Sequence, residues 1–441
     1  MTVIDLGDRA EPTDAQPSHR RRAGRFRPLL VPVTLVVLLA LTGAAPPALR
    51  MQAILPSSLA AEVFLTGDQI VAVVPVREAG DDSQEVLAYR RPARVDGAPQ
   101  PLAPLWRLPI GSNRVSVAEH VGDGGLVLSL FGTDNDKTET MLLDSRTGQL
   151  RWRQPGIATL DGSGRVLLRT YDGQEPIVLA SVELATGRVL WSLPLVARFA
   201  AYHQRSAVID AIVVTTVAGD VEVLDPRTGV SRGRLPAAFA DAGPYQHASV
   251  VGDLVLVPNS TGVAAYHVDG LERRWQTTLP PVAWVHRCGV LACARVDDGG
   301  GVHILDPTTG AVRWRVVEDV DVLRAGDARA LVVDHGSSPL TVAFVAADTG
   351  RVVADGERWD LVDEFGDAPH LLGTRSVRDV GVVLARLDPA HAQPRRIDVL
   401  PGAAGNCGHR ADLIVCRRQD GDFGVWQLRG GEDDRDVDRP R

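Results

Sequence analysis

The fold is decided by the stretch Asp144-Ser145-Arg146-Thr147-Gly148-Gln149-Leu150-Arg151-Trp152, because it returns along the chain at a nearly constant interval. Its Thr-Gly pair is typical of a tight turn between two strands, in which glycine takes the positive φ that the hairpin requires. The aspartate or threonine side chain can bond the backbone of the same turn. A tryptophan follows in the next strand, so each copy predicts a turn and the strand after it.

Five further copies of this turn follow, and they share one period. Two strong copies lead to Trp191 and Trp314. Three weaker copies change the tryptophan position: Gly233 occupies it in one, Trp275 comes one residue late in another, and the third has lost it. The intervals between the turn glycines are 39, 42, 41, 40 and 40 residues, and these glycines are Gly148, Gly187, Gly229, Gly270, Gly310 and Gly350.

Between the turns the chain has the composition of short strands. Runs such as 164–169, 211–215 and 253–257 are rich in Val, Leu and Ile, and no stretch after residue 50 keeps a helical period. A unit of about 40 residues with three or four strands is typical of a β-propeller blade, whereas a parallel β-helix uses shorter coils. The sequence therefore predicts an all-β domain over residues 62–430, a propeller of about eight four-stranded blades, with seven as the alternative. The segment from Cys407 to Leu428 is expected to close the ring against strands near Glu62 to Val76.

The four cysteines form two close pairs, Cys288 with Cys293 and Cys407 with Cys416. Each pair brackets a turn flanked by strand-like residues, and facing positions on a hairpin bring Cβ atoms close enough for a disulfide. Neither pair has the spacing of a zinc knuckle, so metal binding is the weaker reading. We therefore expect two local disulfides in an oxidising compartment, with free buried thiols as the remaining alternative.

The N-terminal region has the charge pattern of a membrane anchor. Residues 1–28 are expected to be a disordered cytoplasmic tail with a basic end, and 29–49 an uncharged transmembrane helix near the lower length limit. Arginines before the apolar run place the tail in the cytoplasm and the propeller outside, at the cell membrane. The alternative is a cleaved signal peptide and a secreted protein. A linker is predicted over 50–61 and a disordered acidic tail over 431–441.

Charge and motifs limit the function classes. The net charge is −8 and Lys137 is the sole lysine, so the sequence favours no nucleic-acid partner. No nucleophile elbow, phosphate-binding loop or zinc-protease motif is present. The acidic loop at Asp297-Asp298-Gly299 is read as a solvated turn rather than as a cation site. We predict no catalytic residue, no cofactor and no metal ligand.

The phrase Leu-Asp-x-x-Thr-Gly-x-x-x-Trp resembles the pyrroloquinoline quinone (PQQ) repeat, which occurs in quinoprotein dehydrogenases and in many propellers that bind no quinone. In that family the motif is structural, and the resemblance implies that the tryptophan docks between adjacent blades. Trp152, Trp191, Trp275 and Trp314 are therefore expected to be core residues. The adjacent-cysteine disulfide that caps the quinone in the dehydrogenases has no counterpart here, because the chain has no Cys-Cys pair.

The sequence thus favours a non-catalytic binding or scaffold propeller outside the cytoplasm, tethered to the cell membrane. Its expected partner is an envelope protein or a cell-wall ligand of unknown identity. Two alternatives remain open at this point. One is a PQQ- or metal-dependent oxidoreductase, and the other is a ligand-sensing ectodomain that acts through a partner.

Overall fold

The computed structural model describes residues 51–428, with gaps at 77–82, 93–97, 123, 133–137, 171–176, 196, 240–245, 298–299, 318 and 363–370. All regular secondary structure in these ranges is β-strand, so the predicted all-β class is confirmed. No helix in this part of the chain is long and apolar enough to cross a membrane. The predicted segments 1–28, 29–49 and 431–441 lie outside the described residues.

The described strands form eight hydrogen-bonded sheets, six of them four-stranded. The four-stranded sheets are β2 (Glu62–Leu65), β3 (Gln69–Pro75), β4 (Gln84–Arg90) and β6 (Trp106–Gly111); β7 (Arg114–Val121), β8 (Gly125–Phe131), β9 (Thr138–Asp144) and β10 (Leu150–Pro155); β11 (Ile157–Leu160), β12 (Arg165–Arg169), β13 (Ile177–Glu183) and β14 (Val189–Leu195); β15 (Ala197–Arg205), β16 (Val208–Thr216), β17 (Val221–Leu224) and β18 (Ser231–Leu235); β19 (Ser249–Val251), β20 (Leu254–Asn259), β21 (Gly262–His267) and β22 (Arg273–Thr278); and β23 (Val282–Cys288), β24 (Leu291–Val296), β25 (Val302–Leu305) and β26 (Val312–Val316).

The two larger sheets complete the set. The five-stranded sheet consists of β34 (Ala403–Arg410), β35 (Leu413–Arg418), β36 (Phe423–Gln427), β1 (Met51–Leu55) and β5 (Gln100–Pro101). The seven-stranded sheet consists of β27 (Val320–Ala325), β28 (Arg329–Asp334), β29 (Leu340–Ala346), β30 (Val352–Val362), β31 (Leu371–Val377), β32 (Gly381–Leu387) and β33 (Arg395–Leu400).

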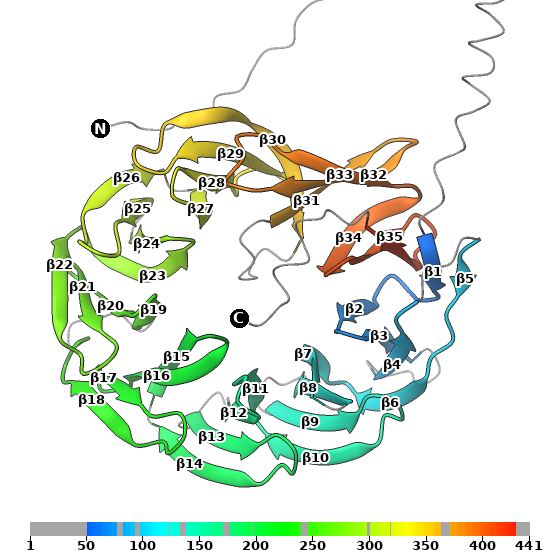
Figure 1. The fold of residues 1–441 in the computed structure, drawn as a ribbon, viewed down its shortest axis with the longest axis horizontal. Coiled ribbons are helices and arrows are strands. Elements are labelled where there is room, and N and C mark those ends of the chain that lie inside the picture. Colours follow the sequence, from blue (N-terminus) through cyan, green and yellow to red (C-terminus); the bar gives the residue numbers. More distant parts are fainter. Residues whose placement is uncertain are drawn as a thin grey trace, which may run out of the picture.

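The sheets are antiparallel meanders that follow one another around a ring with an open centre (Figure 1). In strands such as β8 nearly every residue is buried, because both faces of the sheet pack against neighbouring sheets. Between the β2–β6 sheet and the β7–β10 sheet the packed side chains include Trp106, Val86 and Leu128. Burying one such aliphatic side chain stabilises the fold by roughly 1.5–3 kcal/mol. The core is therefore divided into layers between adjacent sheets.

The ring is closed by its two ends. Strand β1 pairs antiparallel with β36, with Ala53 opposite Val425 and Leu55 opposite Phe423. The prediction that 50–61 is a linker is therefore wrong for Met51–Leu55, which is an integral strand of the last sheet. Strands β2 and β3 pack against the same sheet, where Ile70 joins a core cluster with Val415 and Leu55. Closure in this way hides two sheet edges that would otherwise be exposed.

The predicted number of about eight blades agrees with eight sheets. The seven-stranded sheet contains two successive meanders that share the long strand β30, which pairs with β29 up to Trp359 and with β31 from Asp360. Counted by meanders in the described residues, the ring has nine units, six four-stranded sheets plus two in the seven-stranded sheet plus the closing sheet. The sequence period of about 40 residues therefore corresponds to one four-stranded meander, and two such meanders can belong to one hydrogen-bonded sheet.

Candidate functional site: the turn face of the ring

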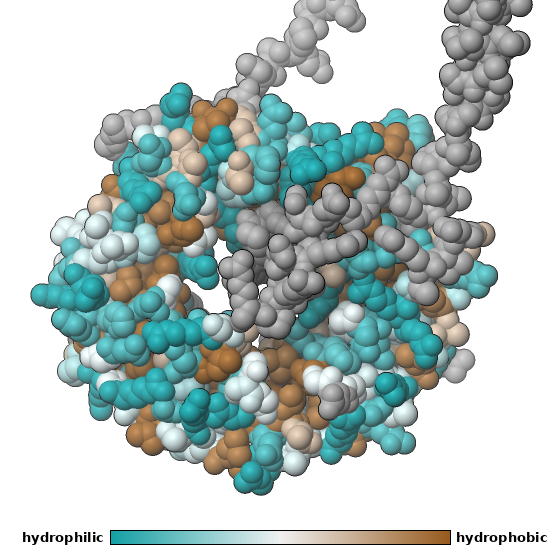
Figure 2. Space-filling view, in the orientation of Figure 1, coloured by the Kyte–Doolittle hydropathy of each residue, from teal (hydrophilic) through white to brown (hydrophobic). Residues whose placement is uncertain are grey.

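One face of the ring carries the repeat turns. In several sheets the turn between the third and fourth strands bonds to the turn between the first and second, for example from Ser145 N to Gly124 O at 2.9 Å and from Ala347 N to Ala328 O at 3.0 Å. Both sets of turns therefore lie on the same side, which we call the turn face. Hydrophobic and hydrophilic surface alternate around the ring in the space-filling view, without one continuous apolar band (Figure 2).

The aspartates of the repeat organise these turns. Asp144 Oδ1 accepts the N–H groups of Arg146 and Thr147, both at 3.1 Å. Its Oδ2 accepts a bond from Arg151 at 2.7 Å, and this bond is the main reason that the pKa of Asp144 falls to about 2. The arrangement recurs at two other turns, where the pairs are Asp225 with Arg232 and Asp306 with Arg313. These carboxylates are held as anions by the fold, which suits a structural role.

An arginine seven residues after each of these aspartates belongs to the repeat, although it was not part of the pattern recognised from sequence. Arg151, Arg232 and Arg313 each stand directly before the tryptophan position. Because alternate residues of a strand face opposite sides, the arginine returns to its own turn while the tryptophan faces the next sheet. The spacing was visible in the sequence and would have supplied a third marker of the period.

Each tryptophan docks on the repeat turn of the following sheet. A Cβ atom added to the turn glycine would lie 2.4–2.9 Å from the indole ring at five positions, Gly148, Gly187, Gly229, Gly310 and Gly350. The indole Nε1 donates to a carbonyl of the same turn in the pairs Trp106 to Ser145 (2.7 Å), Trp152 to Leu184 (2.7 Å), Trp191 to Pro226 (3.0 Å), Trp275 to Pro307 (2.8 Å) and Trp314 to Ala347 (2.9 Å). Four of these rings are buried and that of Trp191 is half-buried.

The sixth turn glycine has no tryptophan above it. A Cβ atom at Gly270 would meet nothing within 4 Å, because Gly233 occupies the tryptophan position of the preceding sheet. Leu271 lies against Gly233 in its place. The junction between the β15–β18 sheet and the β19–β22 sheet thus lacks the indole contact that holds five other junctions.

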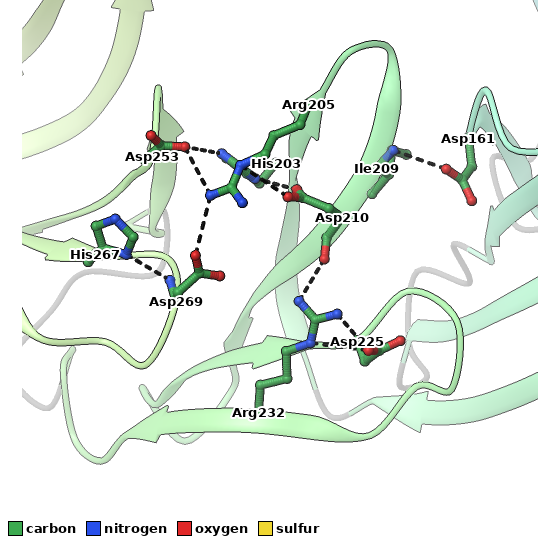
Figure 3. A network of polar contacts seen from close by, with 10 residues as sticks. All are labelled: Asp161, His203, Arg205, Ile209, Asp210, Asp225, Arg232, Asp253, His267 and Asp269. Atoms are coloured by element: carbon green, nitrogen blue, oxygen red, sulfur yellow. Dashed lines mark hydrogen bonds and ion pairs between the residues drawn. The ribbon is translucent and has the colours of Figure 1, made fainter.

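A charged network bridges this junction (Figure 3). His203 is 3% exposed, its Nδ1 contacts Asp210 Oδ1, and its Nε2 contacts Asp253 Oδ1 of the next sheet at 3.1 Å. Arg205 reaches Asp253 and Asp269, both at 3.3 Å. These two carboxylates belong to the β19–β22 sheet, whereas the histidine and arginine belong to β15. Ionic contacts therefore bridge the junction that lacks the indole contact.

The same sheet is tied to its other neighbour by a buried carboxylate. Asp161, in the turn after β11, is fully buried and accepts the N–H of Ile209 at 3.0 Å. Its second oxygen accepts a bond from Ser163 Oγ at 2.6 Å and pairs with Arg165 at 3.2 Å. A buried carboxylate is tolerated only when it is satisfied in this way. The three sheets around His203 therefore share one polar framework on the turn face.

A cleft of about 630 Å³ opens on the turn face, some distance along the ring from this framework. Three turns of the described chain line it, 287–290, 324–329 and 388–390. Arg287 Nε donates to Gly289 O at 3.0 Å and Arg329 Nη1 donates to Ala390 O at 2.8 Å. Neither arginine pairs with a carboxylate of any described residue, in contrast to the arginines of the repeat turns. The cleft therefore presents guanidinium groups that the described part of the protein does not neutralise.

The walls of the cleft are fixed by backbone contacts and by a disulfide. Val290 N donates to Ala325 O at 2.9 Å, and a Cβ atom at Gly289 would lie 2.0 Å from that same oxygen. The disulfide Cys288–Cys293 spans the turn that carries Gly289 and Val290. The second predicted disulfide, Cys407–Cys416, joins directly opposite residues of β34 and β35. Both expected cysteine pairings are therefore present.

No group of three or more His, Cys, Asp or Glu side chains in the described ranges could hold a metal ion. The acidic loop falls partly outside those ranges, and Asp297, its described member, bonds through its N–H to Pro281 O at 2.9 Å.

Comparisons with known proteins give a match to one family model and to several solved structures. A family model described as outer membrane protein assembly factor BamB matches residues 103–279, which contain four of the six repeat turns. No curated protein matches the chain. Among solved structures, BamB from Moraxella catarrhalis is 14% identical with a TM-score of 0.41, covering 71% of this chain and 99% of its own. Sqt1 from Saccharomyces cerevisiae is 10% identical with a TM-score of 0.46, covering 87% and 97%.

A computationally designed protein, Ika8, is 14% identical with a TM-score of 0.45 and covers 71% of this chain and 96% of its own. The match to the BamB model, the tryptophan-on-glycine repeat and the ring of sheets agree with one another. The described strands form a β-propeller, and its residues 103–279 are similar to the family of the BamB model.

Proposed function

We propose that this protein is a non-catalytic scaffold of the cell envelope, tethered to the membrane by its N-terminal segment, which binds a partner protein through the turn face. The observation that carries the proposal is the cleft lined by 287–290, 324–329 and 388–390, because it combines a rigid frame with unneutralised arginines. A volume of 630 Å³ lies within the range of about 300–1,000 Å³ that is usual for binding sites.

An exposed aromatic residue outside the cleft, on the same sheet, also favours a protein partner. Trp284 is 40% exposed, and it is the sole aromatic residue among the large apolar side chains exposed in the described ranges. It stands on β23 three residues before Arg287, and the guanidinium of Arg295 lies 5.5 Å from its ring centroid. Tryptophan and arginine are the residue types most enriched at the energetic centres of protein interfaces.

The compartment is supported by the chain's covalent chemistry. Two disulfides suit an oxidising environment and are rare in the cytosol. The arginine-rich block before the apolar run 29–49 favours export of everything that follows. The family whose model matches 103–279 is described as an outer membrane assembly factor, which is also an envelope role. These three observations favour an extracytoplasmic scaffold.

Site-specific photo-crosslinking in cells tests the proposal. A benzophenone amino acid placed at Val290, which is 49% exposed in the cleft, is expected to give discrete adducts with a partner. Val380 is the matched control, because it is 47% exposed and directly precedes β32. Asp388 follows the other end of the same strand, so Val380 lies on the face opposite to the turn face. Equal adduct patterns from both positions, or none from either, would refute a partner on the turn face.

A further inference from the structure

From the cleft we infer more than a general docking face: it is a binding site for a carboxylate-bearing peptide segment of the partner. This inference rests on the proposed function and names the chemistry that the site selects. It depends on three observations, which are the state of the arginines, the nature of the surfaces between them, and the rigidity of the frame.

The arginines of the cleft differ from those of the repeat turns. Arg151, Arg232 and Arg313 are all engaged by an aspartate of their own turn. Arg287 and Arg329 each use one N–H on a backbone carbonyl and form no ion pair within the described chain. A guanidinium group has five N–H donors in a planar fork that matches a carboxylate, so each keeps donors for an incoming anion.

The carbonyl bonds also orient the two guanidinium groups. Arg329 is half-buried and is held by Ala390 O, which belongs to the connection after β32, so that one side chain spans two turns of the cleft. Arg287 is held by its own turn. An arginine that is already positioned loses less side-chain freedom on binding, which raises affinity for a given contact. The site is thus prepared for an anion before the anion arrives.

Apolar groups separate the charged ones. Val290, Ala325, Ala328, Pro389 and Ala390 line the cleft together with the arginines. A small inorganic anion would use the guanidinium groups and leave these surfaces wet. A peptide whose carboxylate meets an arginine and whose neighbouring side chains are apolar would use both. The volume of the cleft also exceeds what one carboxylate needs.

The charge balance of the cleft favours anions without excluding a positive group. Asp388 is already used, because its Oδ1 accepts the N–H of Ala390 at 2.8 Å and its Oδ2 pairs with His391 at 3.1 Å. Asp327 is exposed and pairs with no described residue, so it is available to a peptide N–H group or an ammonium. Carboxylate recognition by the arginines with a secondary donor contact to Asp327 describes a peptide rather than a phosphate.

Fluorescence polarisation with the purified full chain in detergent tests the inference. The first probe is a labelled, C-terminally amidated peptide in which glutamates alternate with valine and alanine. The second has glutamine in place of glutamate and a free C-terminal carboxylate, and the third probe is inorganic phosphate as a competitor. Saturable binding of the first assigns a side-chain carboxylate and binding of the second assigns a terminal one, and either result supports the inference.

The double variant Arg287→Gln, Arg329→Gln is expected to raise the dissociation constant at least about tenfold, since two charge-assisted contacts are lost. Arg188→Gln is the control, because Arg188 is an exposed arginine of the turn face that pairs with Glu183 outside the cleft. Equal weakening by the control would overturn the inference, as would saturable binding of phosphate without either peptide, or no binding of any probe. Circular dichroism of all variants separates these outcomes from misfolding.

The crosslinking experiment keeps the two levels distinct. If adducts at Val290 persist in the double arginine variant at the wild-type level, the partner docks without the guanidinium groups. That result overturns carboxylate recognition and leaves the scaffold intact. If Val290 gives no adduct even in the wild-type chain, the scaffold proposal itself fails.

Discussion

The packing of tryptophan on the turn glycine allows a quantitative prediction. The propeller supplies an internal control, because one turn glycine, Gly270, has no indole packed on it. Gly350 and Gly270 both have positive φ, 67° and 89°. A Cβ atom at Gly350 would lie 2.6 Å from Trp314, whereas one at Gly270 would meet nothing within 4 Å. Replacement of either by alanine costs the left-handed backbone penalty of roughly 1–2 kcal/mol. Only Gly350→Ala should add the overpacking cost of about 1–3 kcal/mol.

The free energy of unfolding of the full chain in detergent can be followed by far-UV circular dichroism in urea. We expect a loss of about 1–2 kcal/mol for Gly270→Ala and of about 2–5 kcal/mol for Gly350→Ala. Trp314, which is 6% exposed, should cost about 3–5 kcal/mol when replaced by alanine. In the Trp314→Ala background the added cost of Gly350→Ala should fall to that of Gly270→Ala. Two results would refute the reasoning: equal destabilisation of the two glycine variants, or an unchanged cost of Gly350→Ala in the Trp314→Ala background. In either case the indole of Trp314 would not be what requires glycine at position 350.

Three further predictions concern the charged and covalent contacts. His203→Ala should destabilise the chain by about 1–3 kcal/mol, because it removes the buried group that bonds both Asp210 and Asp253. Arg205→Gln, at a half-exposed side chain, should cost less than about 1 kcal/mol in the same urea assay. The pKa of Asp144 is lowered from 3.8 to about 2 in the folded protein. The ionised carboxylate therefore stabilises the fold at pH values above the pKa of the unfolded chain, and this contribution is lost as the pH falls to about 2. In the Arg151→Gln variant the urea midpoint should fall less steeply across that acid range. Mass spectrometry of non-reduced peptides should show the disulfide Cys288–Cys293. Replacement of both cysteines by serine should lower the free energy of unfolding by about 2 kcal/mol, because the bond closes only a short loop. Free thiols at all four cysteines would refute an oxidising compartment.

Much of the fold follows from local chemistry and was therefore readable in the sequence. A turn that needs a positive φ at glycine and a side-chain acceptor at aspartate selects its own residues wherever it occurs, so Gly148 and its five equivalents mark the period. Inner strands such as β8 are buried on both faces and consist of aliphatic runs, whereas fourth strands such as β10 are largely exposed. The pairing of β1 with β36 was not readable in this way, because the pattern within Met51–Leu55 is too short to name a partner at the other end of the chain.

The cleft could not be predicted from the sequence either, because its lining residues come from turns that are far apart along the chain. Its arginines come from a turn at Arg287 and from another at Arg329, and the carbonyl that holds the second comes from Ala390. One local feature distinguishes these arginines from Arg151 and Arg313. Their difference is the absence of an aspartate seven residues before each of them, since Pro280 and Val322 stand at those positions. The repeat aspartate is thus the signal that separates structural arginines from available ones, and it can be recognised only once the turns have been placed.

The same comparison explains the polar framework around His203. At five junctions an indole ring is packed on glycine, and burial of such a ring is worth about 3–5 kcal/mol. At the junction where Gly233 replaces it, the bridging groups are largely exposed, with Arg205 51% and Asp253 60% accessible, and exposed ion pairs contribute about 0–1 kcal/mol each. Among the bridging polar groups only His203 is buried, so most of the cohesion there comes from the aliphatic cluster that contains Val213, Val255 and Leu271. At this junction charged contacts and Leu271 therefore supplement an apolar core that includes Val213, Val223 and Val255, and salt should weaken only the charged part of the contact.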